Sequence, residues 1–285
     1  MYRQKLCLSL IGQLKTPQFE QPALYKAAGF EAFFPCFESK SQMLTLADKA
    51  KALSMEIQSV HAPYRCMRAF WYDAPEGDAA QRELEDCIEA AGEANVPIAV
   101  CHAYIGFYTG EQPTKTGLNR VEKLVKLAQK AGVKLAFENT EGEEFLKAIL
   151  DEFQSEKTVG FCWDTGHEQC YGYGEDFIKK HGDRLIATHI NDNLGVSRLD
   201  GRIDWTDDLH LLPFDGIIDW RNLVKRLNDV RFDGTLTFEL NKNNKPNRHE
   251  LDKYEQMTDE QYIAEAYARA CRVAEYKRRE LLNRN

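Results

Sequence analysis

Long hydrophobic runs are missing from this chain of 285 residues. No apolar stretch approaches the ~20 residues that a membrane-spanning helix needs, so we expect no membrane segment. The first residues lead into only a short apolar run without a cleavage pattern, which predicts that no signal peptide is present.

The chain also lacks Cys-x-x-Cys spacing among its eight cysteines. Four of them, Cys7, Cys36, Cys101 and Cys162, fall inside apparent strands. We therefore expect small buried thiols in a reducing compartment, not a disulfide framework. This usage predicts a cytoplasmic protein.

Positive charge is in deficit, with 37 basic against 45 acidic residues and a net charge of −8. This balance disfavours a bulk polyanion-binding surface, so we do not expect nucleic acid as a partner, although a local basic patch is compatible with it. The hydrophobic content of 43% is that of an ordinary globular protein, and the length suffices for a full core.

Short apolar runs alternate with segments of helical periodicity along the chain. The expected strands cover residues 6–10, 31–37, 57–61, 98–102, 134–138, 159–164, 185–189 and 235–240. The expected helices cover residues 18–28, 41–53, 79–94, 117–131, 143–153, 176–181, 219–227 and 258–279. Ser41 is the expected N-cap of the second helix. We predict one domain over residues 1–285 with a C-terminal helix over residues 258–280.

Strict alternation of strand and helix predicts an α/β protein with a parallel sheet. The strands are continuous apolar runs, as expected when helices and a barrel interior bury both faces. Right-handed crossovers then favour a closed (β/α)8 TIM barrel, whose usual length is about 250 residues. The alternative is an open doubly wound sheet, but no Gly-x-Gly-x-x-Gly motif follows the first strand.

Several apolar runs end in a residue that can bind a metal ion. These residues are His61, His102, Glu138, Asp164, His189 and Glu239. Taken singly, each could be a hydrogen-bonded structural side chain. In a barrel, however, the carboxyl ends of all the strands converge on one face. Several carboxylates and imidazoles in one cavity would repel one another or stay poorly solvated without a cation, so the sequence predicts a divalent metal site.

The loops add further polar candidates at the same face. His167 lies three residues beyond the end of the sixth strand. Asp208 and His210 are two residues apart and can face the same way on an extended segment, although a solvated loop is the alternative. Trp71 and Trp205 follow the third and seventh strands, where a tryptophan either stacks on a sugar or base or packs in the core. Four loop arginines could clamp a phosphate or remain solvated: Arg65, Arg68, Arg198 and Arg202.

Six short motifs coincide with these strand ends. They occupy residues 60–64 (VHAPY), 137–142 (FENTEG), 163–167 (WDTGH), 188–192 (THIND), 210–220 and 238–239. Together they resemble the xylose isomerase-like TIM barrel superfamily over nearly the whole chain. That superfamily includes sugar and sugar-phosphate isomerases, ketose epimerases and endonuclease IV.

In the epimerase branch, the resemblance implies one divalent cation with four ligands, Glu138, Asp164, His189 and Glu239. The two glutamates would also act as acid and base. Mn²⁺ or Zn²⁺ is the expected ion, with Mg²⁺ or Co²⁺ as alternatives. The remaining residues of the mouth are then expected to bind substrate: His61, His102, His167, Asp208, His210 and Trp205.

The endonuclease IV branch implies a different activity, which is phosphodiester hydrolysis at abasic DNA sites with three zinc ions. These ions would also draw on His61, His102, His167, Asp208 and His210, and the chain has all of them. The acidic balance argues against a duplex binder, and the seventh loop is closer to the isomerase-like members. A metal-dependent lyase or dehydratase and a non-catalytic sugar-binding or subunit-interaction protein are also compatible with these residues.

The sequence therefore predicts a metal-dependent sugar or sugar-phosphate isomerase or epimerase. Removal of a proton alpha to a carbonyl would give an enediolate, and return of a proton would complete the reaction. The expected partner is a small carbohydrate, and the long C-terminal helix could serve a homo-oligomer.

Overall fold

Short parallel strands form the centre of the molecule, in a computed structural model that describes residues 4–284. Within that range the strands are β1 (Leu6–Ser9), β2 (Ala32–Phe34), β3 (Glu56–Ile57), β4 (Val60–His61), β5 (Ile98–His102), β6 (Lys134–Glu138), β7 (Val159–Asp164), β8 (Leu185–His189) and β9 (Leu236–Phe238). The strands predicted at residues 98–102, 134–138, 159–164 and 185–189 have the same bounds in the structure, where they are β5 to β8.

Two hydrogen-bonded sheets join to close the barrel. One sheet has the order β3-β2-β1-β9 and the other has the order β4-β5-β6-β7-β8. Parallel bridges between Cys36 and His61, and between Ile190 and Phe238, connect the two sheets at their edges. The predicted (β/α)8 TIM barrel is therefore confirmed.

The third strand of the barrel differs from its prediction. It is divided into β3, which pairs with β2, and β4, which pairs with β5. The intervening backbone stays bonded to the preceding strand, since the N–H of Gln58 donates to Phe33 O at 3.0 Å and that of His61 donates to Pro35 O at 2.9 Å. This stretch thus passes from one sheet to the other and carries His61 to the mouth.

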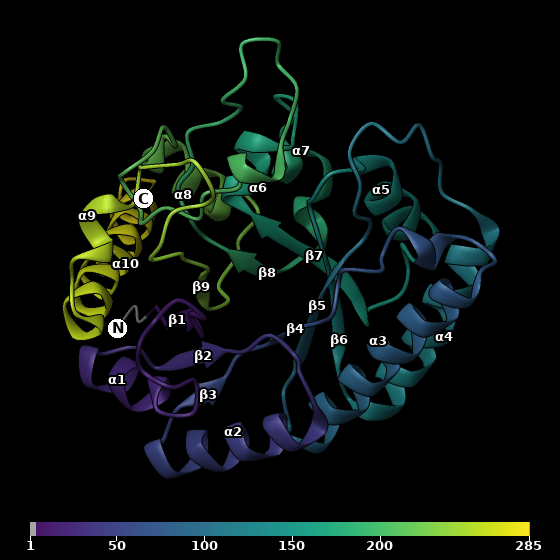
Figure 1. Cartoon of the computed structure of the whole chain (residues 1–285), viewed down its shortest axis with the longest axis horizontal. Coiled ribbons are helices and arrows are strands. Elements are labelled where there is room, and N and C mark those ends of the chain that lie inside the picture. Colours follow the sequence, from purple (N-terminus) through teal and green to yellow (C-terminus); the bar gives the residue numbers. More distant parts are fainter. Residues whose placement is uncertain (1–3, 285) are drawn as a thin grey trace.

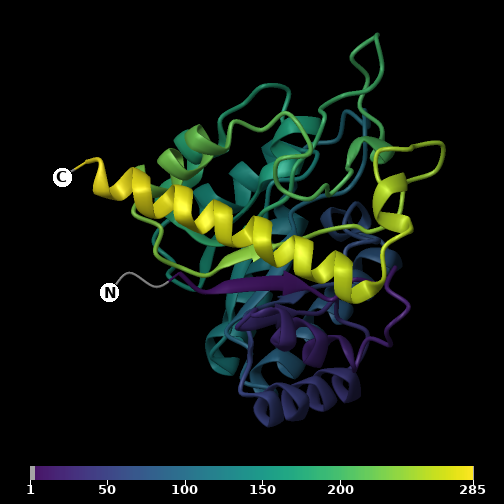
Figure 2. The same ribbon diagram turned by 90° about the vertical axis from the view of Figure 1, so that its left-hand side faces the viewer.

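Helices surround the strands on their outer side (Figure 1). They are α1 (Gln21–Ala28), α2 (Lys40–Leu53), α3 (Pro75–Glu93), α4 (Lys115–Ala131), α5 (Glu143–Glu152), α6 (Thr165–Cys170), α7 (Phe177–His181), α8 (Trp220–Asp229), α9 (Asp252–Glu255) and α10 (Asp259–Leu282). The long α10 packs against α1 and α8 (Figure 2).

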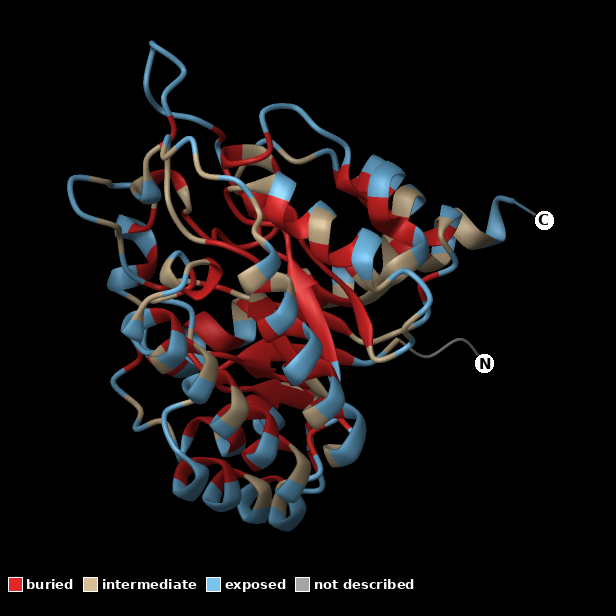
Figure 3. Cartoon of the chain, turned by 90° about the vertical axis from the view of Figure 1, so that its right-hand side faces the viewer, coloured by how far each residue is buried: buried red, intermediate tan, exposed pale blue. Residues whose placement is uncertain are grey.

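Burial follows the helical and strand periodicities read from the sequence. The strands and the inward helix faces are buried, whereas the outward helix faces are exposed (Figure 3). In α3, the apolar residues Leu84, Cys87, Ile88 and Ala91, which recur at helical spacing, are buried. Burial of such apolar side chains is the main favourable contribution to folding. Between residues 4 and 284, no helix has both the length and the apolar character needed to cross a membrane.

Two local predictions were wrong. The N-cap of α2 is Ser39 and not Ser41, because the Ser39 side chain accepts a hydrogen bond from the N–H of Gln42 at 3.1 Å. Cys36 is exposed and not buried, because β2 ends at Phe34 and leaves the thiol at the barrel mouth. Cys7, Cys101 and Cys162 are buried free thiols, as predicted.

The loop expected after the sixth strand, which carries His167, is instead the short helix α6. The Asp164 carboxylate caps it by accepting a hydrogen bond from the N–H of His167 at 2.6 Å. The cap fixes the position of His167 relative to the strand end.

Candidate metal centre

Four side chains from neighbouring strand ends converge on one point of the barrel mouth. Each of them offers one ligand atom, and these atoms all lie within 4.8 Å of one another: Glu138, Asp164, His189 and Glu239. The cause is strand register, since Asp164 at the end of β7 stands directly beside His189 at the end of β8. The predicted ligand set is therefore assembled, and its role as a metal site remains a proposal.

Direct contacts link these side chains. His189 Nδ1 lies 2.7 Å from Glu138 Oε1 and 3.1 Å from Glu239 Oε2. Glu138, Asp164 and His189 are fully buried, while 20% of the Glu239 side chain is exposed. Glu239 is thus the member of this set that reaches the space above the cluster.

Two further groups of metal-type side chains adjoin the first group. His61 Nε2 and His102 Nε2 lie 3.5 Å and 3.3 Å from Glu138 Oε2. On the other side, Asp208 Oδ2 lies 2.9 Å from His210 Nε2, and Asp208 Oδ1 lies 3.5 Å from His167 Nε2. All the residues predicted for the metal and its surroundings therefore come together, with Trp205 on the rim.

The polar atoms of the cluster fit a cation. Among the described residues, Glu138 Oε2 and Asp208 Oδ1 are buried oxygen atoms to which nothing donates a hydrogen bond. Burial of such an atom is costly unless a hydrogen bond or an ion compensates it. Carboxylate oxygens together with imidazole nitrogen are suitable donors for Mn²⁺ and Zn²⁺. The chemistry of these residues thus agrees with a divalent metal.

Mutual electrostatics shift the pKa values within the cluster. Burial opposes ionisation of Glu239, yet the positive charges of His189 and His210 prevail and lower its pKa to about 2. Burial also opposes charging of His210, but Asp208 and Glu239 raise its pKa to about 9. For Asp164, burial prevails over the opposing effect of His167 and raises the pKa to about 6. The ionisation of the carboxylates and that of the imidazoles thus depend on each other in a small buried volume.

Two asparagines, for which the sequence predicted no role, hold Asp164 in place. The Asn139 side chain donates to Asp164 O and accepts from Asp164 N, both at 2.8 Å. Asn191 Nδ2 donates to Asp164 Oδ2 at 2.9 Å. Asn139 directly follows Glu138, and Asn191 lies two residues after His189, so both occur in the motifs already quoted.

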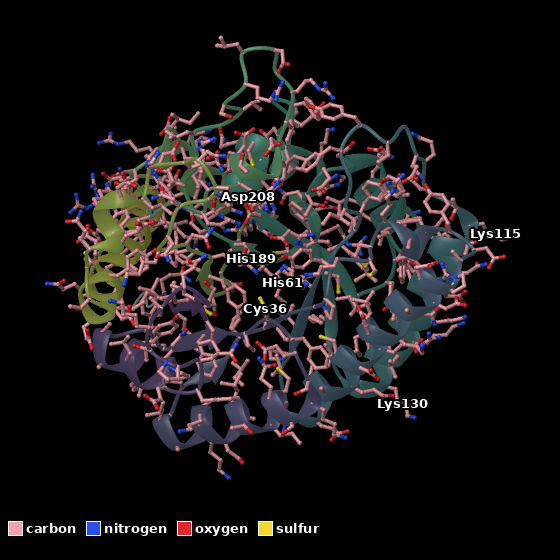
Figure 4. The ribbon with its side chains drawn as sticks, viewed as in Figure 1. Cys36, His61, Lys115, Lys130, His189 and Asp208 are labelled. Carbon is pink, nitrogen blue, oxygen red and sulfur yellow. The ribbon has the colours of Figure 1, made fainter. Side chains whose placement is uncertain are left out.

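A pocket of about 200 Å³ lies over the cluster, and its lining includes Glu239. Figure 4 shows His61, His189 and Asp208 near the middle of the barrel, with Cys36 next to His61 and with Lys115 and Lys130 on the periphery. The predicted pocket residues His61, His102, His167, Asp208, His210 and Trp205 all line the pocket.

Other lining residues were not predicted: Tyr64, Ile105, Phe107, Glu141, Tyr171 and Lys245. Glu141 is buried and accepts a hydrogen bond from the N–H of Gly106 at 2.8 Å. Lys245 Nζ lies 5.3 Å from the centre of the Trp205 ring and 3.6 Å from Asp208 Oδ2. Tyr64 and Glu141 fall inside quoted motifs, whereas no sequence signal marks Lys245, which reaches the pocket through tertiary structure.

The other aromatic and arginine candidates lie away from the cluster. Trp71 is fully buried and donates from Nε1 to Ala103 O at 2.8 Å, so it belongs to the core. Arg68 pairs with Glu111 at 2.8 Å and Arg198 pairs with Asp200 at 3.0 Å. These two arginines are therefore held by carboxylates. Arg65 is exposed, and Arg202 lies over the Tyr108 ring.

Comparison with known proteins also indicates the barrel fold. A family model described as xylose isomerase-like TIM barrel matches residues 22–266. An uncharacterized protein of Sinorhizobium fredii, y4fM, is 34% identical over 156 residues, which are 54% of this chain and 43% of that protein. A probable endonuclease 4 of Cenarchaeum symbiosum is 31% identical over 178 residues, which are 54% of this chain and 62% of that protein. The matches thus span less than two thirds of these relatives.

Solved structures share the fold at lower sequence identity. A D-tagatose 3-epimerase-like protein superposes with a TM-score of 0.67 at 22% identity, covering 88% of this chain and 94% of that chain. The IOLI protein, solved with a zinc atom, superposes with a TM-score of 0.74 at 17% identity, covering 95% of this chain and 99% of that chain.

Proposed function

Because the chain belongs to the xylose isomerase-like TIM barrel family, we propose that it is a metal-dependent isomerase or epimerase of a small sugar or sugar phosphate. One observation carries this proposal: two glutamates share a four-residue cluster directly below a small pocket, and Glu239 opens into that pocket. The fold shared with a D-tagatose 3-epimerase-like protein agrees with it.

Glu138, Asp164, His189 and Glu239 would hold one divalent cation. When bound, such an ion polarises a substrate carbonyl and lowers the barrier to removal of the neighbouring proton. Three carboxylates and one imidazole suit Mn²⁺ or Zn²⁺, with Mg²⁺ or Co²⁺ as alternatives. The zinc atom in the structure of the IOLI protein supports a divalent ion in this fold.

Proton transfer would fall to the two glutamates. Glu239, which is partly exposed to the pocket, would take the proton alpha to the carbonyl and leave an enediolate. Return of a proton to the other face of the same carbon gives an epimer, and return to the neighbouring carbon gives an aldose–ketose isomer. Glu138, whose Oε1 lies 2.7 Å from His189 Nδ1, would serve as the second acid–base group.

The rest of the pocket would position the sugar. The imidazole groups of His61, His102 and His167 can hydrogen-bond hydroxyl groups, and Asp208 and His210 offer a further charged pair. Trp205 can pack against the C–H face of the sugar.

Solvent deuterium incorporation tests this function. The protein is incubated with Mn²⁺ in D₂O and with a panel of aldoses, ketoses and their phosphates, and exchange is followed by NMR. We expect exchange at the carbon next to the carbonyl of at least one sugar, with loss of that exchange on chelation. Glu239→Gln should lower the rate by about 10²–10⁴-fold. Chelation-resistant exchange, or undiminished exchange in Glu239→Gln, would contradict the mechanism.

A second function is supported by the two extra donor groups, His61 with His102 and His167 with Asp208 and His210. Three adjoining groups can hold more than one ion, and multi-metal centres suit phosphodiester hydrolysis. The similarity to a probable endonuclease 4 agrees with this alternative. The net charge of −8 speaks against duplex binding. Three zinc ions per chain with cleavage of abasic duplex would favour hydrolysis, and one ion with sugar exchange would favour the isomerase.

A further inference from the structure

Two exposed tyrosines stand on the rim of the barrel mouth, outside the pocket. Tyr108 is 53% exposed and Tyr173 is 72% exposed. Burial and then the neighbouring Tyr108 hydroxyl raise the pKa of Tyr173, so the two side chains lie close together although they come from loops that are far apart in the sequence. The pair is thus a small, defined aromatic surface, called here the rim platform.

Both tyrosines have a backbone conformation that is uncommon for a bulky residue. The φ angle is 56° at Tyr108 and 50° at Tyr173, in the left-handed region. The turns at both positions direct a large side chain toward solvent, where it gains little from packing. Unfavourable backbone conformations of this kind concentrate at ligand-binding positions.

The rim platform continues the wall of the pocket. Phe107, which precedes Tyr108, and Tyr171, two residues before Tyr173, both line the pocket, and their ring centres are 5.4 Å apart. The Tyr171 ring in turn stacks on His167, with ring centres 5.1 Å apart. A series of rings thus runs from the candidate metal centre to the rim.

A third loop, at residues 193–204, completes the surface. It projects from the top of the molecule (green in Figure 1, pale blue in Figure 3). Its Ile203 N–H donates to the Tyr108 hydroxyl, and the Arg202 guanidinium lies 5.1 Å from the centre of the Tyr108 ring. Hydrogen-bond donors and acceptors therefore stand at the edge of an exposed aromatic face.

The volume of the pocket limits what it can hold. Pockets for drug-sized ligands have volumes of about 300–1,000 Å³. The pocket here has about 200 Å³, which suits one small ring. A second ring attached to the first would have to lie outside, on the rim.

We propose that the rim platform is a second sugar subsite, so that the substrate is a reducing disaccharide, with the residue that carries the free carbonyl in the pocket and the other ring on Tyr108 and Tyr173. Tyrosine suits this role because its ring packs against the C–H face of a sugar and its hydroxyl bonds to the hydroxyl groups at the sugar edge. The inference rests on the proposed function, whose substrate class it narrows.

Equilibrium binding tests the subsite without requiring turnover. Calorimetric titrations of the Mn²⁺-loaded protein compare D-fructose with three glucosyl-fructoses, turanose, maltulose and isomaltulose. We expect at least one disaccharide to bind roughly tenfold or more tightly than fructose, since tenfold corresponds to about 1.4 kcal/mol, an ordinary aromatic contribution. Tyr173→Ala should remove this advantage and leave fructose binding unchanged.

Three control variants distinguish the effect of the tyrosine ring from that of its hydroxyl and from a general effect of removing an exposed apolar side chain. Tyr173→Phe keeps the ring and should retain most of the advantage. Tyr108→Phe removes only the hydroxyl that accepts from Ile203 and tests its contribution to the loop. Leu282→Ala replaces an exposed apolar residue at the end of α10, 58% exposed, and should have no effect.

The proposal is overturned if no disaccharide binds more tightly than fructose, or if the advantage persists in Tyr173→Ala. A change of oligomeric state in Tyr173→Ala, measured by sedimentation, would overturn it in favour of an interface between copies of the chain. Deuterium exchange is measured separately with the same sugars. Its absence together with a disaccharide advantage would refute the isomerase and leave the subsite standing.

Discussion

Replacing Asn191 with Ala should weaken metal binding although Asn191 is not among the proposed ligands. Asn191 Nδ2 donates to Asp164 Oδ2 at 2.9 Å, and the other oxygen, Oδ1, accepts from the N–H of His167 at 2.6 Å. Both oxygens of this fully buried carboxylate are therefore oriented by donors. Removal of one donor lets the carboxylate turn away from the position shared with Glu138 and His189.

The expected magnitude follows from the contact that is lost. A hydrogen bond to a charged group contributes about 1.5–3 kcal/mol. Loss of a partner that orients a metal ligand typically lowers metal affinity by about 10–100-fold, or about 1.4–2.8 kcal/mol. The two estimates agree, so we expect the dissociation constant for Mn²⁺ or Zn²⁺ to rise by about that factor in Asn191→Ala.

A chelator competition titration measures this dissociation constant. The matched control is Asn228→Ala, which removes a buried amide that donates to Lys277 O at 3.0 Å between α8 and α10. Both variants should lose stability, but only Asn191→Ala should lose metal affinity. Equal affinity in the wild-type protein and Asn191→Ala would refute the reasoning that Asp164 is an oriented ligand.

Three further predictions concern the same molecule. A saturating divalent ion should stabilise the protein by about 2.7 kcal/mol when its concentration is 100 times the dissociation constant, visible as a higher melting temperature that chelation reverses; an unchanged melting temperature would argue against a metal centre. Gly166→Ala should reproduce the affinity loss of Asn191→Ala without adding to it in the double variant, because a Cβ at Gly166 would lie 1.9 Å from Asn191 Oδ1; additive losses would show that the two positions act separately. Asp259→Asn should lower the free energy of unfolding by about 3 kcal/mol at neutral pH, since it leaves Lys242, 2.8 Å away, buried without its counter-charge. Burial opposes ionisation of Asp259, but hydrogen bonds from Lys242 and Thr16 prevail and lower its pKa. The difference in free energy of unfolding between wild type and variant should therefore be full above about pH 4 and shrink as the pH falls further. Urea titrations at several pH values measure this difference, and a difference that does not change with pH would contradict the prediction.

The sequence predicts best where apolar runs are continuous and bounded by polar residues. Strands β5 to β8 match their predicted bounds, and they deliver His102, Glu138, Asp164 and His189. Because parallel strands in register end at one level, the convergence of these side chains follows from the strand pattern alone.

Predictions from the local sequence were wrong where contacts between distant segments determine the structure. The run at residues 31–37 continues past Phe34, yet β2 ends there and Pro35 can offer only its carbonyl to the next strand. The segment Thr165–Cys170 is too short to show helical periodicity, and its capping contact is visible only in three dimensions. Trp71 and Trp205 look alike in the sequence, but only the second is exposed.

The positions of the pocket residues Glu141 and Lys245 could not be predicted from the sequence either. Glu141 is turned into the pocket wall by a backbone hydrogen bond from Gly106, a residue 35 positions away. Lys245 comes from the loop after β9 and meets Trp205 from the loop after β8. Contacts between separate loops carry no periodic signal, so a single sequence cannot reveal them.

The junction between β8 and β9 determines how an ion at the candidate centre would connect the two sheets of the barrel. On that side of the barrel, one isolated β-bridge, Ile190 with Phe238, and a hydrogen bond from the N–H of Thr237 to the Thr188 hydroxyl at 3.2 Å join the five-stranded sheet to the four-stranded sheet. Glu138, Asp164 and His189 belong to one sheet, and Glu239 follows a strand of the other. An ion bound by all four side chains would therefore link the two sheets of the barrel at this junction. Amide hydrogen exchange at Ile190 and Glu239, whose N–H groups bond across it, should then slow when the ion is added.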